Sequence, residues 1–120
     1  MQFSKLVPNI FYKDIRNGLT LFVDCLEFEI GHNEIDTAHP FCVLSKDGLR
    51  INLFQDKALA EEHNPEFRLV TDNIEEVYES VSKRFPQFLH PNLSTVTLRP
   101  WGAQEFALTD GQIGIVIQQW

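Results

Sequence analysis

The chain has 120 residues, of which 43% are hydrophobic and 22% charged, and its formal net charge is −7. This length and composition are typical of one globular domain with its own hydrophobic core, and they argue against a disordered chain. No apolar run approaches the ~20 residues of a membrane helix. The N-terminus lacks a signal-peptide pattern, so a cytoplasmic location is expected. An acidic surface repels nucleic-acid phosphates and attracts cationic ligands, so we expect no nucleic-acid or membrane partner.

The first half of the chain predicts a strand, a helix and three further strands. Residues 6–12 are typical of a strand, and Asp14 is placed to cap the helix that follows. Gly18 weakens that helix slightly, but four apolar residues at helical spacing give it one buried stripe. The stripe consists of Ile15, Leu19, Phe22 and Leu26.

The strands of the first half follow this helix. "EFEIGH" alternates Phe28, Ile30 and His32 with polar or small residues, which predicts a half-buried strand. "PFCVLSKDGLRINLF" predicts a hairpin with its turn at Asp47-Gly48. The polar segment 57–65 is then predicted to be a linker with one helical turn.

The second half repeats this order. "EFRLVTD" predicts a strand, and "DNIEEVYESVSKRF" predicts a helix in which Asn73 and Glu76 have capping-box spacing. The helix has an apolar stripe of Ile74, Val77, Val81 and Phe85. Beyond Pro86 the chain offers three extended segments, "FLHPNLSTVTLRP", "GAQEFALTD" and "GIVIQQW".

Two pairs of similar segments within the chain indicate a duplicated module. "DGLRINLFQ" at 47–55 matches "DGQIGIVIQ" at 110–118, and "IFYKD" ending at Asp14 matches "RLVTD" ending at Asp72. We therefore predict a single α+β domain of two βαβββ modules. Module one spans about 1–56, the linker about 57–65, and module two about 66–120.

The two cysteines, Cys25 and Cys42, have no C-x-x-C spacing. Redox and zinc-knuckle sites therefore lack support, and we expect both thiols to be buried as small apolar groups.

The order of strand, Asp and helix, the segment "LFVDCLEFEIG" and above all the late "PWGAQEFALTDG" resemble the vicinal oxygen chelate superfamily. This superfamily includes glyoxalase I, extradiol dioxygenases and bleomycin resistance proteins. "LVPNIFYKD", and Pro-Trp-Gly followed two residues later by Glu-Phe-Ala, most resemble the bleomycin resistance branch. The resemblance implies curled mixed sheets and a homodimer whose clefts draw on both subunits.

The resemblance also implies where a divalent cation would be held, on the first and a late strand of each module. These positions fall at Val7 and Pro65 and near Asn52–Phe54 and Ile115–Ile117, where only Asn52 has a donor atom. We therefore expect no metal and no other cofactor, which disfavours a metal-dependent lyase, isomerase or dioxygenase. An enzyme with unexpected ligands, or with Glu105 or a histidine as acid–base group, remains the alternative.

A separate cluster, "HNEIDTAH", contains ligand types suited to a divalent metal. It places His32, Glu34, Asp36 and His39 within eight residues. Because the segment joins two predicted strands, a polar turn is the favoured interpretation. His63 and His90 are interpreted as surface loop residues.

The remaining function is binding without catalysis. Along "LRINLF", the side chains of Arg50, Asn52 and Phe54 share one strand face. They are candidates to line a cup, the concave side of a curled sheet. The resemblance places Phe41 where a bleomycin resistance protein has a drug-facing phenylalanine, and Trp101 on its Pro-Trp-Gly tryptophan. The candidate ligand-binding residues are Phe41, Trp101, Asn52, Phe54, Arg50 and His39.

These side chains predict a protein that sequesters a cationic or aromatic compound such as bleomycin. Structural interpretations stand beside this one. Phe41 is equally suited to a strand core, and Trp101 to plugging the end of a sheet. Glu105 is placed to fix the turn at Trp101, and Trp120 to anchor an edge or a dimer interface. A pure interaction protein, with cups filled by its own side chains, is a third alternative.

Overall fold

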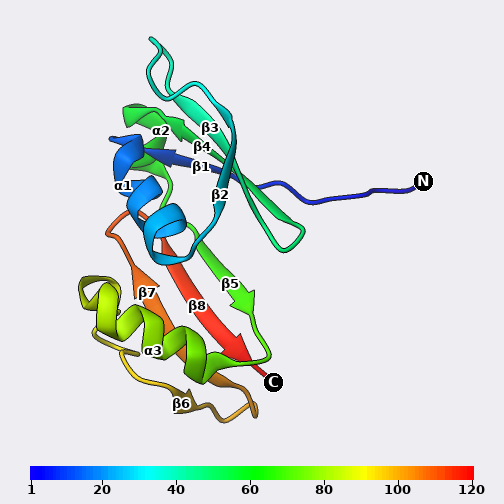
Figure 1. The fold of residues 1–120 in the computed structure, drawn as a ribbon, viewed down its shortest axis with the longest axis vertical. Helices are drawn as coiled ribbons and strands as arrows, with labels where there is room; N and C mark the ends of the chain where they lie inside the picture. The colour runs from blue at the N-terminus through cyan, green and yellow to red at the C-terminus, as the bar shows by residue number, and fades with distance from the viewer. The chain divides into compact units, whose positions relative to one another are not determined.

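In the computed structural model of residues 1–120, the chain forms two four-stranded mixed sheets, each with helices (Figure 1). The sheets belong to two compact units, Met1–His63 and Asn64–Trp120. The predicted α+β architecture of two βαβββ modules is confirmed. None of the helices is both long and apolar enough to cross a membrane.

The sheet of the first unit has the strand order β1-β4-β3-β2. Its strands are β1 (Asn9–Tyr12), β2 (Glu29–Asn33), β3 (Phe41–Lys46) and β4 (Leu49–Gln55). β1 pairs in parallel with β4, and the other neighbours pair antiparallel. The predicted hairpin joins β3 to β4, and both Asp47 and Gly48 have positive φ, as a two-residue hairpin turn of type I′ requires.

One face of this sheet is covered by a helix, α1 (Ile15–Leu19), that continues as π-helical turns over Thr20–Cys25. The shared core includes Tyr12, Phe22 and both cysteine side chains, so the prediction that the thiols are buried is confirmed. Burial raises the pKa of the Cys42 thiol. The side chains of β1, β3 and β4 that point to the other face are half-exposed or exposed.

Gly18 has a packing role that helix propensity alone does not reveal. It is buried where α1 passes over Tyr12, and a Cβ atom at this position would lie 2.5 Å from Cε2 of the tyrosine ring. The small residue therefore permits close approach of the helix to the first strand.

One expectation for the first unit is wrong. The segment of β2 is predicted to be half-buried, but all five residues of β2 are exposed, because it is an edge strand whose register shifts between Ile30 and Asn33. The helical turn predicted within 57–65 is present as a six-residue helix, α2 (Lys57–Glu62), that packs against β1. Asp56 caps this helix, since its side chain accepts a hydrogen bond from the backbone N–H of Leu59 at 3.0 Å.

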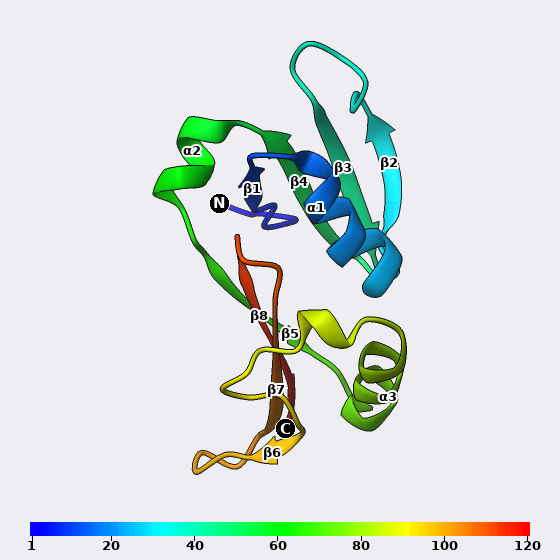
Figure 2. The same ribbon diagram turned by 90° about the vertical axis from the view of Figure 1, so that its left-hand side faces the viewer.

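The sheet of the second unit has the order β5-β8-β7-β6, with β5 parallel to β8. Its strands are β5 (Glu66–Val70), β6 (Thr97–Leu98), β7 (Gln104–Thr109) and β8 (Gly114–Gln119). Helix α3 (Ile74–Arg84) lies along one face and contacts β7 and β8 (Figure 2). Asn73 caps this helix, because its Oδ1 accepts from the Glu76 N–H. The reciprocal bond of a capping box is absent: Glu76 Oε2 accepts from the side-chain Nδ2 of Asn73, whose backbone N–H donates to Thr71 Oγ1.

The first extended segment predicted for this half is mostly irregular. A short 3-10 turn (Pro86–Phe88) leads into it and ends at its first residue, and only two of its residues form strand β6. Its prolines lack the N–H that a sheet ladder needs. The segment still follows β7, because the His90 N–H donates to the Ala107 carbonyl and the Ala107 N–H donates to the Leu93 carbonyl.

The repeat is present with a register that differs by one residue from the sequence match. In each unit, a glutamine near the end of the last strand accepts a hydrogen bond from the first N–H of the helix: Gln55 from Ile15 at 3.1 Å, and Gln119 from Ile74 at 2.8 Å. The helix caps are Asp14 and Asn73. Asn73 and Gln119, not Asp72 and Gln118, are thus the counterparts of Asp14 and Gln55.

Candidate ligand-binding site

Three phenylalanines form a line across the open face of the first sheet. Phe11 on β1, Phe54 on β4 and Phe41 on β3 are paired across neighbouring strands, so their side chains share one face. The centroids of the Phe11 and Phe54 rings lie 5.7 Å apart, and those of Phe54 and Phe41 lie 5.5 Å apart with an interplanar angle of 13°. All three rings are half-buried, which leaves ring surface open to a ligand.

Two histidines extend this line at its ends. The His32 ring lies 5.3 Å from Phe41, and the His63 ring lies 6.0 Å from Phe11. We call the five rings His63, Phe11, Phe54, Phe41 and His32 the aromatic row. The first unit thus presents a continuous surface of ring faces and edges.

Hydrogen bonds orient both histidines. His63 Nδ1 lies 2.8 Å from the Leu59 carbonyl, and because a carbonyl only accepts, Nδ1 carries the proton. His32 Nε2 lies 2.6 Å from Glu34 Oε2. As expected of a surface loop residue, His63 is exposed and lies outside the helices and strands; it also follows α2 as its C-cap and packs against Phe11.

Polar side chains lie beside the aromatic row on the same face. Asn52 Nδ2 donates to Asn9 Oδ1 at 3.0 Å across the parallel pair of strands. Arg50, two residues earlier on β4, is exposed on the same face. Four of the six predicted residues, Phe41, Phe54, Asn52 and Arg50, are thus brought together on one sheet face.

The other two predicted residues lie elsewhere. His39 is exposed in the segment between β2 and β3, and Trp101 belongs to the second unit. Of the four candidate metal ligands in "HNEIDTAH", only His32 and Glu34 are joined to each other by a hydrogen bond or ion pair. No group of three or more His, Cys, Asp or Glu side chains is close enough to hold a metal ion.

Trp101 lies in the turn between β6 and β7, and its side chain is 50% exposed. Gly102 has a φ of +97°, which lets the turn close with its N–H bonded to the Arg99 carbonyl. The Trp101 Nε1–H donates to Glu105 Oε2 at 2.9 Å. The indole is therefore held by its polar edge, while part of its ring remains accessible.

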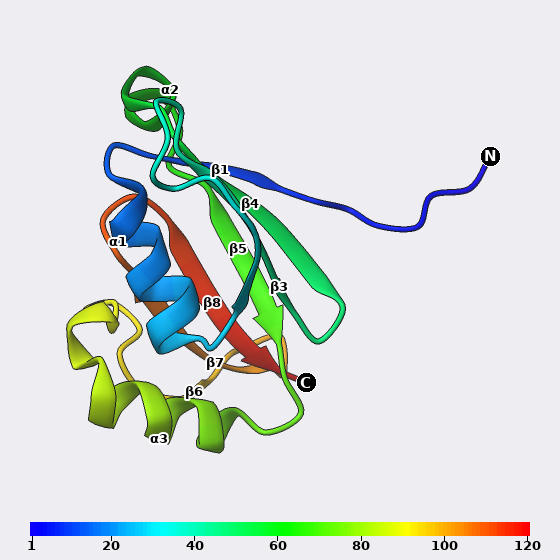
Figure 3. The ribbon, with the colours of Figure 1, turned by 45° about the horizontal axis from the view of Figure 1, so that its top comes forward.

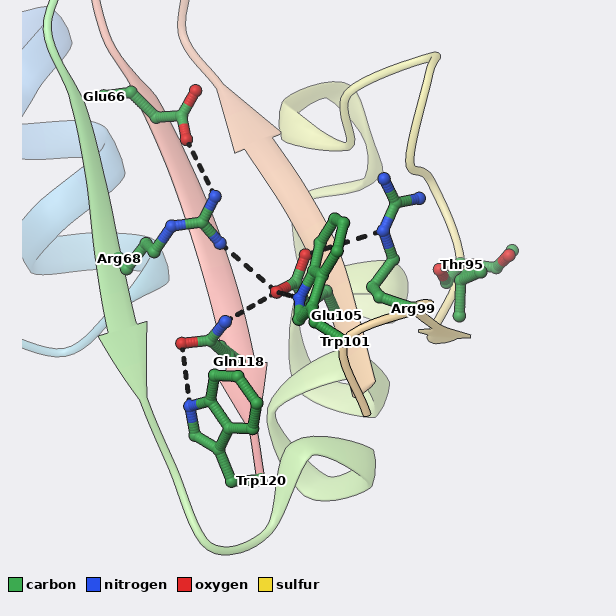
Figure 4. Close-up of polar contacts among 9 residues, drawn as sticks. Glu66, Arg68, Thr95, Arg99, Trp101, Glu105, Gln118 and Trp120 are labelled. Atoms are coloured by element: carbon green, nitrogen blue, oxygen red, sulfur yellow. Dashed lines mark hydrogen bonds and ion pairs between the residues drawn. The ribbon is translucent and has the colours of Figure 1, made fainter. Parts of the chain in front are cut away.

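Glu105 is the centre of a polar cluster on the open face of the second sheet (Figure 4). It is 2% exposed, and its Oε2 also accepts hydrogen bonds from Arg68 Nη1 at 3.2 Å and Gln118 Nε2 at 2.6 Å. Arg99 Nε lies 3.8 Å from the other oxygen, Oε1. Gln118 Oε1 in turn accepts from the Trp120 indole at 3.2 Å.

Glu105 ties down the Trp101 turn, since the buried carboxylate accepts from the Trp101 indole, and three further donor side chains surround it. Arg68, Arg99 and Gln118 were not singled out by sequence reasoning. The signal available in the sequence was Gln118, a polar residue that strand alternation places on the same face as Gly114 and Val116 of "GIVIQQ".

A cleft of about 490 Å³ lies beside this cluster in the second unit. Ala107 and Thr109 of β7 and Gly114 and Val116 of β8 line it, on the same side of the sheet as Glu105. Their small side chains leave room for a bound molecule. Of the ionised side chains, the lining includes those of Glu66 and Arg99, and His90 is a further titratable group.

The donor atoms do not fit the metal centre that the resemblance implies. In the register of the repeat seen in the structure, the counterpart of Val7 is Glu66 and not Pro65. Likewise, the counterparts of Asn52–Phe54 are Val116–Gln118 and not Ile115–Ile117. Two donors, Glu66 and Gln118, are thereby added to the expected set. However, Glu66 Oε1 lies 3.6 Å from Arg68 Nη2, and the Asn52 and Gln118 amides are hydrogen-bonded to other side chains. One arginine-paired carboxylate and two neutral amides make a poor set for a divalent ion.

Known proteins were compared with this chain in sequence and in structure. No family model and no curated protein matches the sequence. Solved structures do match, including a bleomycin-binding protein in complex with bleomycin, which is 20% identical and superposes with a TM-score of 0.72 over 98% of this chain and 99% of the other.

Two further structures show the range of the fold. A member of the glyoxalase/bleomycin resistance protein/dioxygenase superfamily from Sphaerobacter thermophilus is 18% identical, with a TM-score of 0.70 over 98% of both chains. The fosfomycin resistance protein FosX from Listeria monocytogenes is 12% identical, with a TM-score of 0.71 over 100% of this chain and 95% of the other. The chain therefore has the vicinal oxygen chelate fold, the fold of a bleomycin-binding protein and of a protein from the glyoxalase/bleomycin resistance protein/dioxygenase superfamily.

Proposed function

We propose that the protein binds a small aromatic or cationic compound without a metal and sequesters it in clefts of a homodimer. The observation that carries the proposal is the aromatic row on the open face of the first sheet. Half-buried rings fixed by strand pairing are pre-ordered for stacking, so a flat ligand is bound with little loss of side-chain entropy. The bleomycin-binding protein with the same fold supports a small-molecule ligand of this kind.

Charge supports a cationic group on the ligand. The chain carries a net charge of −7, and Glu34 lies next to the His32 end of the row. A cation placed over a phenylalanine face gains about 0.5–2 kcal/mol, the larger value when water is excluded. A planar ligand with one cationic tail therefore uses both features of this face.

Exposed apolar side chains support the homodimer. The segment before β1 leaves the first sheet as an extended chain (Figure 3) and carries Phe3 and Leu6, with relative exposures of 85% and 88%. Trp120, at the end of β8, is 70% exposed. Phenylalanine and tryptophan are enriched at interfaces between chains relative to the rest of the protein surface. A second copy of the chain is the partner we propose, in the cytoplasm.

The test is a titration of chelator-treated protein with metal-free and copper-loaded bleomycin, and with the planar cation proflavine, followed by calorimetry. We expect saturable binding at one ligand per subunit. Phe54→Leu is expected to weaken it by about tenfold, because the central ring of the row is lost while a side chain of similar volume remains.

Phe85→Leu is the matched control. Phe85 stacks on Phe88 in the second unit and is also half-buried, so its replacement tests the loss of an aromatic ring outside the row. Equal weakening by the two variants would contradict a site on the aromatic row. No heat with either bleomycin form or with proflavine would contradict the proposed function itself.

A further inference from the structure

Arg99 has a buried donor that the protein leaves unsatisfied. Its Nε atom is the one buried side-chain nitrogen or oxygen without a hydrogen-bond partner. The nearest carboxylate oxygen, Glu105 Oε1, lies at 3.8 Å, which is beyond hydrogen-bond distance. Because protein atoms cover Nε, a ligand reaches this guanidinium through its two Nη groups.

The carboxylate beside Arg99 is already shared by other donors. Arg68, Trp101 and Gln118 all donate to Glu105 Oε2, and Arg68 makes the closer ion pair. Glu66, the other carboxylate of the cleft, is 3.6 Å from Arg68. Arg99 therefore has one long ion pair, with Glu105 Oε1 at 3.8 Å, but its Nε makes no hydrogen bond to either carboxylate.

The guanidinium of Arg99 is also held in place where it borders the cleft. Its central carbon lies 4.8 Å from the centroid of the Trp101 ring, and the ring is tied to Glu105 (Figure 4). Arg99 lines the 490 Å³ cleft, its side chain is 34% exposed, and Ala107 and Val116 provide an apolar surface nearby. A planar guanidinium stacked on an indole is pre-ordered to bind an oxyanion through two parallel N–H groups.

We infer that Arg99 is an anion-binding residue, and that the cleft of the second unit takes a compound with an apolar body and one carboxylate, phosphate or phosphonate group. The oxyanion pairs with the Arg99 guanidinium, and the apolar body lies against Ala107 and Val116. This inference is independent of the aromatic row, because every residue in it belongs to the second unit.

The test uses the full-length, ¹⁵N-labelled protein and follows the arginine Nε–Hε signals by NMR. Benzoate and phenylphosphonate are the probes, and benzamidine, with the same ring and the opposite charge, is the counter-probe. We expect both acids to shift the Arg99 Nε–Hε signal saturably and benzamidine to leave it unchanged. The acid that saturates at lower concentration identifies the preferred oxyanion.

Arg68→Gln is the matched control for Arg99→Gln. Both variants remove an arginine from Glu105, but only Arg99 lines the cleft. We expect Arg99→Gln to weaken binding of the two acids at least about tenfold and Arg68→Gln to change it less than about twofold. If both variants weaken binding equally, or if neither acid shifts the wild-type Arg99 signal, the inference is overturned. If a variant fails to fold, the wild-type spectra alone still test whether the acids bind at Arg99.

Discussion

Replacing Glu105 by glutamine is expected to lower the free energy of unfolding by about 3 kcal/mol or more. The carboxylate is 2% exposed and faces two arginines, a tryptophan N–H and a glutamine amide. Glutamine keeps the shape but removes the negative charge, so the arginines lose their shared counter-ion. If its oxygen faces Trp101 and Gln118, its NH₂ group faces Arg99, where two donors oppose one another.

The measurement is chemical denaturation at neutral pH, with Glu66→Gln as the control. Glu66 is a carboxylate 3.6 Å from the same Arg68, but its side chain is 60% exposed. Solvent screens an exposed pair of this kind, so we expect the control to change stability by less than about 0.5 kcal/mol. Equal effects of the two variants would show that burial of the Glu105 cluster contributes little.

Gly18→Ala is expected to destabilise the protein by about 1–3 kcal/mol, although alanine is the better helix former by about 1 kcal/mol. The new methyl group would lie 2.5–2.9 Å from three ring atoms of Tyr12, which is buried at 1% exposure. Neither the ring nor the helix moves without disturbing the core of the first unit. Thermal or chemical unfolding measures the loss.

Two further variants isolate this cause. Gly31→Ala places a Cβ atom 3.6 Å from the Val43 carbonyl, an ordinary contact, and is expected to be neutral or mildly stabilising. Tyr12→Leu removes the ring, so adding Gly18→Ala to it should cost less than in the wild type. A Gly18→Ala cost that is unchanged without the ring would refute the steric explanation.

Much of the fold could be predicted because its signals are local. The Asp47-Gly48 turn, the Asn73 cap and the alternation of "LRINLF" all arise from neighbouring residues. The errors arose where tertiary context decides. Strand β2 is exposed because it is an edge, and β6 is short because its segment pairs with β7 mainly through irregular backbone contacts.

The candidate site was predictable only within a strand or hairpin. Phe41, Asn52 and Phe54 lie on the same hairpin, so alternation places them on one face. Phe11 and His63 were missed because the parallel pairing of β1 with β4 is not visible in local sequence. Similarly, Arg68 joins Glu105 across 37 residues of sequence, a separation at which no periodicity reports contact.

In each unit, the hydrogen bond from the first helical N–H to a glutamine of the last strand affects how the protein folds. The first turn of the α1 helix depends on Gln55, 40 residues further along the chain, and that of α3 depends on Gln119, 45 residues further along. The local caps Asp14 and Asn73 satisfy other N–H groups of each first turn, but the first helical N–H finds its acceptor only when the last strand is in place. We therefore expect each helix start to become fully protected against amide exchange only when the sheet of its own unit is complete.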